Sequence, residues 1–198
     1  MPQIDTNGLK LEYDERGPRD GRPVLLIMGL GSQMTRWPDP FLDQLAGDGC
    51  RVIRFDNRDI GLSSWFDEAG IPDFGAIAGA VAAGKSPALA YSLEDMAADA
   101  VGVLDALGIE RAHIVGVSMG GMIAQLVTIH YPDRVLSLTS IMSSSGNRAL
   151  PRATKEAQAM LTTPAPNPET DRDAFLDRAV ASSRIIGSPA YPLDEAAV

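Results

Sequence analysis

The sequence Gly-Val-Ser-Met-Gly at residues 116–120 constrains the fold of this chain more than any other feature. It follows an apolar run that is typical of a buried parallel strand, and it precedes apolar residues at helical spacing. A serine on a sharp strand-to-helix turn has a strained backbone, so the residues two before and two after it must lack bulk. Gly116 and Gly120 meet this requirement. The pattern predicts that Ser118 projects from a nucleophile elbow.

Apolar runs of strand length recur along the chain, at residues 24–28, 51–55, 113–117 and 135–141, and helix-length segments separate some of them. Strands that alternate with helices predict an α/β fold with a doubly wound, mainly parallel sheet. The opening segment differs, because Asn7-Gly8 separates two runs in which apolar and polar residues alternate. This dipeptide tolerates positive φ at both positions and predicts an N-terminal antiparallel hairpin.

Helix signals are clearest over residues 93–107, which carry an apolar stripe. Ser92 is the expected N-cap with Asp95 in the capping-box position, and Gly108 ends the helix. A second helix should follow Ser118 directly and stop at Pro132. A third is expected over residues 40–46, and residues 65–90 are expected to be irregular or loosely helical.

The character of the chain changes after Ser143, where a polar linker leads into proline-rich and helical stretches. We therefore expect two parts, an α/β core over residues 1–147 and the start of a helical cap or lid over residues 148–198.

Net charge and cysteine content indicate which partners and which cellular compartment to expect. A formal net charge of −9 argues against nucleic acid and anionic membranes as partners. Neither a signal peptide nor a transmembrane segment is predicted, and the single cysteine, Cys50, precedes a strand-like run and is expected to be a buried thiol. These features favour the cytoplasm. No metal-ligand spacing and no phosphate-binding loop with its lysine is present, so we expect no metal and no cofactor.

Ser118 would need a base, a group that orients the base, and donors for the oxyanion. The backbone N–H groups of Met119 and Leu30 are the expected donors. Gly29 and Gly31 would let the loop approach the substrate. Several apolar residues, Trp37 and Met122 foremost, are candidates to line a substrate pocket, with core packing as the alternative for each. The others are Met28, Met34, Trp65, Phe66 and Met119.

The base and its orienting acid are not found near Ser118. His113 would lie about 16 Å back along an extended strand. His130 would lie about 18 Å away along a regular helix. Both histidines are expected to be structural, and residues 142–147 contain no carboxylate. In the order serine, acid, histidine, both partners would follow Val198, which leads us to expect a truncated chain.

Residues 56–59, Asp-Asn-Arg-Asp, follow the second parallel strand. We expect their side chains to hold the oxyanion loop in place by charge-assisted hydrogen bonds, in preference to a direct catalytic role.

Three segments together resemble the α/β-hydrolases: residues 24–33, 55–64 and 116–121. The Asp-Asn-Arg-Asp-x-Gly-Leu-Ser-Ser variant and the Met-Gly-Leu-Gly loop are similar to the branch that contains aclacinomycin methylesterase. The resemblance covers residues 1–145 clearly and implies ester hydrolysis. Members with epoxide hydrolase or haloalkane dehalogenase activity carry aspartate at the elbow, whereas serine favours acyl chemistry.

The leading hypothesis is thus a serine esterase that acts on a small-molecule ester through an acyl-enzyme on Ser118. Acyl transfer, perhydrolysis and carbon–carbon bond cleavage use the same serine and remain open. A second hypothesis is a binding or scaffold protein that kept the elbow and lost the triad. A third is a chain that pairs with another polypeptide. An unpaired sheet edge would also favour self-association of the 198 residues.

Overall fold

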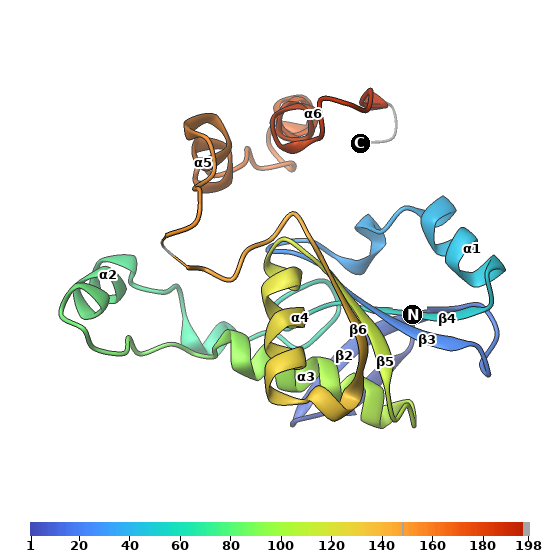
Figure 1. The fold of residues 1–198 in the computed structure, drawn as a ribbon. Helices are drawn as coiled ribbons and strands as arrows, with labels where there is room; N and C mark the ends of the chain where they lie inside the picture. Colours follow the sequence, from blue (N-terminus) through green and yellow to red (C-terminus); the bar gives the residue numbers. More distant parts are fainter. Residues whose placement is uncertain (148, 196–198) are drawn as a thin grey trace. The chain divides into compact units, whose positions relative to one another are not determined.

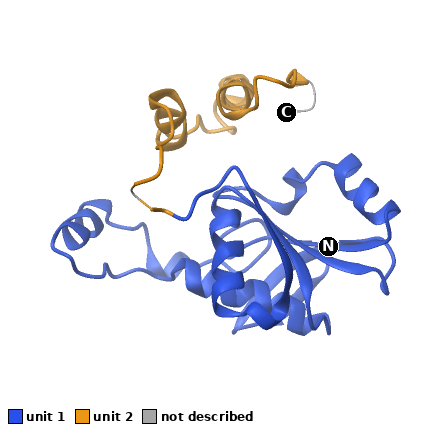
Figure 2. Cartoon of the chain, viewed as in Figure 1, with its two compact units in different colours: residues 1–145 blue, residues 146–198 orange. Residues whose placement is uncertain are grey.

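The computed structural model describes residues 1–147 and 149–195. The chain divides into two compact units, residues 1–145 and 146–198 (Figure 2). The interpretation of residues 148–198 as the start of a cap or lid stays a prediction.

The first unit begins with an antiparallel hairpin. β1 (Gln3–Thr6) pairs with β2 (Leu9–Arg16) so that Thr6 lies opposite Leu9. Asn7 and Gly8 both have positive φ, 51° and 76°. This is the geometry that a two-residue turn matched to the strand twist requires, so the Asn-Gly signal identifies the hairpin correctly.

Six strands form one sheet in the order β1-β2-β4-β3-β5-β6. Four of these strands, β3 (Arg22–Ile27), β4 (Cys50–Phe55), β5 (Ala112–Val117) and β6 (Val135–Ile141), run parallel. β2 joins β4 in the antiparallel sense. The predicted mainly parallel α/β sheet with an antiparallel N-terminal hairpin is confirmed (Figure 1).

Helices cover both faces of this sheet, as the alternation of side chains along β3 shows. Val24 and Leu26 pack in a core cluster with residues of α1 (Asp39–Gly47). Leu25 and Ile27 point the other way, into a cluster that includes α3 (Leu93–Ala106) and α4 (Met119–His130). Because the central strands are buried on both faces, their sequences read as continuous apolar runs.

The helix ends follow the signals in the sequence. Ser92 Oγ accepts a hydrogen bond from the Asp95 N–H, and the Asp95 carboxylate accepts one from the Ser92 N–H, which completes the capping box. Gly108 follows α3 with a φ of 65°. α4 begins immediately after Ser118 and ends before Pro132, which starts a short 3₁₀ helix, η3 (Pro132–Arg134).

Between β4 and α3 the chain forms little regular structure. It contains η2 (Asp67–Ala69) and α2 (Phe74–Ala82), and α2 buries none of its side chains. The expectation of an irregular or loosely helical segment fits this arrangement. Another 3₁₀ turn, η1 (Met34–Arg36), follows β3.

The second unit contains two helices, α5 (Lys155–Thr162) and α6 (Arg172–Ile186). Thr154 and Asp171 are their N-caps, and Arg178 of α6 donates a hydrogen bond to the carbonyl of Thr163 at 2.9 Å. Within the described part of the chain, helices fall short of the length and apolarity that a bilayer span needs.

β6 forms one end of the six-stranded sheet. All its residues except Val135 are exposed, among them Leu136, Leu138 and Ile141. The strand carries no charge that would discourage pairing with another strand.

Candidate active site

Ser118 lies on the turn between β5 and α4 with φ 54° and ψ −122°. Positive φ at a non-glycine residue of this kind costs about 1–3 kcal/mol and persists only where the surroundings enforce it. The Ser118 N–H donates to the Ile141 carbonyl at 2.9 Å, and the Ser118 carbonyl accepts from the Gly121 N–H at 2.9 Å. These bonds hold the strained turn between the end of β6 and the first turn of α4.

Glycines permit main-chain atoms to pack closely around this turn. A methyl group at Gly116 would lie 2.1 Å from the Gly120 carbonyl oxygen, and one at Gly120 would lie 2.2 Å from that of Ile27. A methyl group at Gly29 would lie 3.1 Å from Ser118 Cβ and 3.6 Å from its Oγ. The absence of side chains thus brings the end of β3, the loop after it and the serine turn together.

Two backbone N–H groups lie on the elements that meet at Ser118. Met119 is the first residue of α4, and Leu30 lies in the loop after β3 with its side chain 75% exposed. Neither N–H donates to any group in the described part of the chain. Gly31 follows with a φ of 65°. Unpaired N–H groups at a helix N-terminus favour a negative charge nearby.

The loop from Met28 to Met34 is fastened at both ends by residues that follow β4. Asp56 Oδ1 accepts from the Met34 N–H at 2.5 Å, and Asn57 Nδ2 donates to the Met28 carbonyl at 3.1 Å. Both side chains are buried. Burial raises the pKa of Asp56, and the hydrogen bond from Met34 opposes that rise. Of the four residues expected to anchor the loop, Asp56 and Asn57 bond to it, whereas Arg58 bonds to Asp99 and Asp59 accepts from the Phe66 N–H.

Arg58 is buried and its charge is paired. Its Nε donates to Asp99 Oδ2 at 2.7 Å, and Asp99 Oδ1 accepts from Asn7 Nδ2 at 3.1 Å. The guanidinium carbon lies 5.3 Å from the ring centroid of Phe66 and 5.0 Å from that of Tyr91. Sequence reasoning missed Asp99 and Tyr91; an acidic residue within the core-facing part of α3 was the available signal for Asp99.

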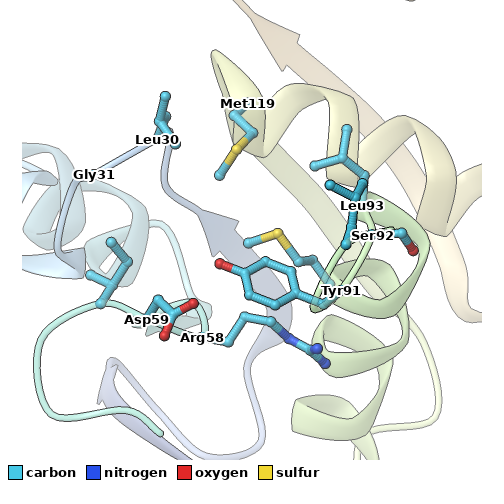
Figure 3. Close-up of a pocket in the computed structure, with 11 residues that line it drawn as sticks. Leu30, Gly31, Arg58, Asp59, Tyr91, Ser92, Leu93 and Met119 are labelled. Atoms are coloured by element: carbon cyan, nitrogen blue, oxygen red, sulfur yellow. The ribbon is translucent and has the colours of Figure 1, made fainter. Parts of the chain in front are cut away.

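A pocket of about 430 Å³ opens beside the loop and the start of α4 (Figure 3). Its lining comes from the loop after β3, the segment after β4, and the starts of α3 and α4. The lining residues are Leu30, Gly31, Arg58, Asp59, Ile60, Leu89, Tyr91, Ser92, Leu93, Met96 and Met119. This volume lies in the range of small-molecule sites.

Three of the residues predicted at the substrate site, Leu30, Gly31 and Met119, line this pocket, and Gly29 adjoins Ser118. Trp37 and Met122 are not among its lining residues. Trp37 instead packs in the core on the α1 side, where its ring stacks on Phe41 at 5.7 Å. An apolar side chain that follows a loop can serve either role, and only the packing decides.

The two histidines lie away from Ser118. His113 is the second residue of β5, at the end of the strand away from Ser118. Its Nδ1 forms a 2.7 Å hydrogen bond with Ser137 Oγ on β6. His130 is the last residue of α4, at the end opposite Ser118. Across the described residues, His, Cys, Asp and Glu side chains form no group of three suited to a metal ion.

Comparison with known proteins places this chain in a family. The α/β hydrolase fold family matches residues 22–183. Rhodomycin D methylesterase of Streptomyces sp. (strain C5) is 37% identical over 123 residues, which are 62% of this chain and 35% of that protein. Rhodomycin D methylesterase of Streptomyces peucetius is 32% identical over 192 residues, 87% of this chain and 57% of that protein.

A crystal structure of a hydrolase from Pseudomonas aeruginosa PA01 superposes with a TM-score of 0.60 and 26% identity, over 89% of this chain and 57% of that one. This chain therefore spans between about a third and somewhat over half the length of these relatives. The family match over most of the sequence agrees with the sheet order and the serine turn, and the chain belongs to the α/β-hydrolase fold family.

Proposed function

We propose that this chain is the serine-bearing part of a hydrolase that cleaves carboxylic esters of small molecules. One observation carries the proposal: Ser118 occupies a strained turn between a strand and a helix, and Gly29 of the loop after β3 packs against it. The N–H groups of the next residues, Leu30 and Met119, have no partner in the described part of the chain. The names of the methylesterase relatives support an ester as the substrate.

The proposed reaction begins with attack of Ser118 Oγ on the ester carbonyl carbon. A base takes the serine proton as the new carbon–oxygen bond forms, and the carbonyl oxygen becomes an oxyanion between the Leu30 and Met119 N–H groups. Collapse breaks the ester bond, and the alcohol leaves with the proton. Water then cleaves the acyl-enzyme by the same steps. One such backbone donor contributes about 2.7–4 kcal/mol to the transition state.

Neither histidine is placed to act as the base, because His113 bonds Ser137 on β6 and His130 lies at the end of α4 opposite Ser118. We propose that a histidine and its orienting carboxylate complete the site in the native protein. Groups of a triad act as a unit, and loss of the base lowers the rate by roughly 10⁴ to 10⁶. The 198 residues alone should therefore turn over esters slowly or not at all.

Covalent labelling tests the role of Ser118. A fluorophosphonate should modify the native protein at this residue, as mass spectrometry of the labelled peptide would show, and Ser118→Ala should abolish labelling. Ser137→Ala is the matched control and should label normally, because Ser137 lies exposed on β6 and bonds only His113.

Labelling at another residue would refute the proposal. Absence of labelling with Ser118 intact and the protein folded would instead favour the second candidate, a protein that binds an apolar ligand in the pocket of about 430 Å³ and has lost the triad.

A further inference from the structure

The pocket lined by Leu30 and Met119 has apolar walls and one polar end, which carries Asp59, Tyr91 and the paired Arg58. Leucine, isoleucine and methionine side chains form most of its surface, while Asp59 and Tyr91 lie at its far side from Leu30 (Figure 3). A polar group in such a setting fixes the orientation of a ligand, because water that would otherwise solvate the group is largely displaced.

Asp59 is held in a defined position. It has a φ of 62°, its N–H donates to the Ser64 carbonyl at 3.0 Å, and its Oδ1 accepts from the Phe66 N–H at 2.6 Å. An aspartate in the left-handed region is tolerated, and such conformations cluster at binding sites.

Tyr91 lies beside Asp59 at this end of the pocket (Figure 3). Burial, followed by hydrogen bonding to Asp59 and the negative charge of that carboxylate, raises the pKa of Tyr91 to about 12, while Arg58 lowers it. The hydroxyl is therefore protonated at neutral pH and acts as a donor. A carboxylate has about four acceptor sites, so Phe66 and Tyr91 leave part of its capacity unused.

The positive charge closest in sequence does not neutralise Asp59. Arg58 forms its ion pair with Asp99, and its guanidinium lies near the rings of Phe66 and Tyr91. None of the ion pairs among the described residues includes Asp59. The capping box at the start of α3 likewise places Asp95 against the N–H of Ser92, which offsets the partial positive charge of that helix end.

We propose that the Asp59 end of the pocket binds a protonated amine carried on an apolar arm of the substrate. An ammonium group would fill the unused acceptor sites of Asp59 by charge-assisted hydrogen bonds, and the arm would lie along the leucine and methionine walls. A hydroxyl in the same place would bind more weakly, and an anion would be repelled. The proposal rests on the proposed function only in taking this pocket as the substrate pocket.

Equilibrium binding tests this preference without any reaction. NMR titration of the protein with 3-phenylpropylamine, 3-phenylpropanol and 3-phenylpropanoate compares three ligands that share one arm. We expect the amine to bind roughly tenfold tighter than the alcohol at low salt, with the carboxylate weakest and the margin shrinking as salt rises. Equal affinities, or tightest binding of the carboxylate, would overturn the proposal.

Two variants assign the preference to Asp59. Asp59→Asn keeps an oxygen that accepts from Phe66 N–H and should erase the difference between amine and alcohol. Asp133→Asn removes the same charge at an exposed site on η3 and should leave the difference intact. Tyr91→Phe retains the carboxylate and should keep the preference for the amine. Loss of the preference in Asp133→Asn, or its survival in a folded Asp59→Asn, would contradict the assignment.

The outcome is independent of the labelling of Ser118. A preference for the amine without labelling of Ser118 would support amine binding at Asp59 and refute the proposed hydrolase. Labelling of Ser118 without a preference for the amine would support the hydrolase and refute amine binding.

Discussion

Asn57 Nδ2 donates a hydrogen bond to the carbonyl of Met28 at 3.1 Å, and so ties the segment after β4 to the loop after β3. Asn57 is buried, and the loop that it holds carries Gly29 and Leu30 alongside Ser118. The position of the Leu30 N–H therefore depends on a side chain that is not among those lining the pocket.

Asn57→Ala should lower kcat about tenfold with little change in KM, because it disturbs a donor that acts in the transition state. It should also lower the free energy of unfolding by roughly 1–3 kcal/mol, since the buried Met28 carbonyl loses its partner. Steady-state kinetics and urea unfolding of the native protein measure the two effects. A rise in KM at constant kcat would show that Asn57 positions the substrate instead.

Gly116→Ala should prevent native folding, because its methyl group would lie 2.1 Å from the Gly120 carbonyl oxygen. The control is Gly47→Ala at the end of α1, where nothing lies within 4 Å of an added methyl group. That change should be neutral or stabilise by about 0.5–1 kcal/mol, since alanine loses less conformational entropy in a helix. Thermal unfolding followed by circular dichroism compares them. Equal melting temperatures would contradict the close packing around Ser118.

Arg58→Met should destabilise the first unit by about 3–5 kcal/mol, because it strands the buried carboxylate of Asp99. Replacing both residues, Arg58→Met with Asp99→Leu, should recover much of that loss, since no buried charge remains unpaired. A double-mutant cycle in urea measures the coupling between the two positions. Additive effects would indicate that the ion pair contributes nothing beyond packing.

Stability should fall as the pH rises from about 10 to about 12. The folded-state pKa of Tyr91 is raised, so its contribution is complete below the unfolded-state value near 10 and is lost as the pH passes the folded value. Tyr91→Phe should weaken this alkaline dependence. Absorbance near 295 nm should show one of the four tyrosines ionising later than the rest, and a simultaneous titration would refute the assignment.

The 198 residues should self-associate through β6, whose apolar edge is exposed. Leu138→Lys should reduce the associated fraction in sedimentation velocity. Ile129→Lys, which adds the same charge at an exposed position of α4, should have less effect. A monomer at every concentration would contradict this prediction.

Local signals in the sequence were sufficient for most of the elements. Asn7-Gly8, the Ser92 and Asp95 capping box and Pro132 act through their nearest neighbours, so the hairpin and the ends of two helices were predictable. The mainly parallel direction of the strands followed from the alternation of strands and helices along the chain. The serine turn was predictable from both kinds of signal. Its glycines are required by the tight turn itself and by the close approach of the neighbouring strand.

The polar end of the pocket was not predictable in this way. Asp59 meets Tyr91, and Arg58 meets Asp99, across stretches of chain that include residues 65–90, which form little regular structure. Nothing in their local sequence distinguishes these side chains from solvated charges. Trp37 shows the same difficulty, because its neighbours in sequence fit a pocket wall and a packed core equally well.

Because main-chain atoms pack closely around Gly116 and Gly120, different parts of the protein determine the position of Ser118 and the shape of the pocket. The turn that carries Ser118 is held by main-chain atoms of β3, β5 and α4, whereas Leu93 and Met96 of α3 line the pocket. Randomising Leu93 and Met96 in a library would therefore alter which molecules enter the pocket without disturbing the turn that carries Ser118. The scaffold is in this respect well suited to laboratory evolution of selectivity.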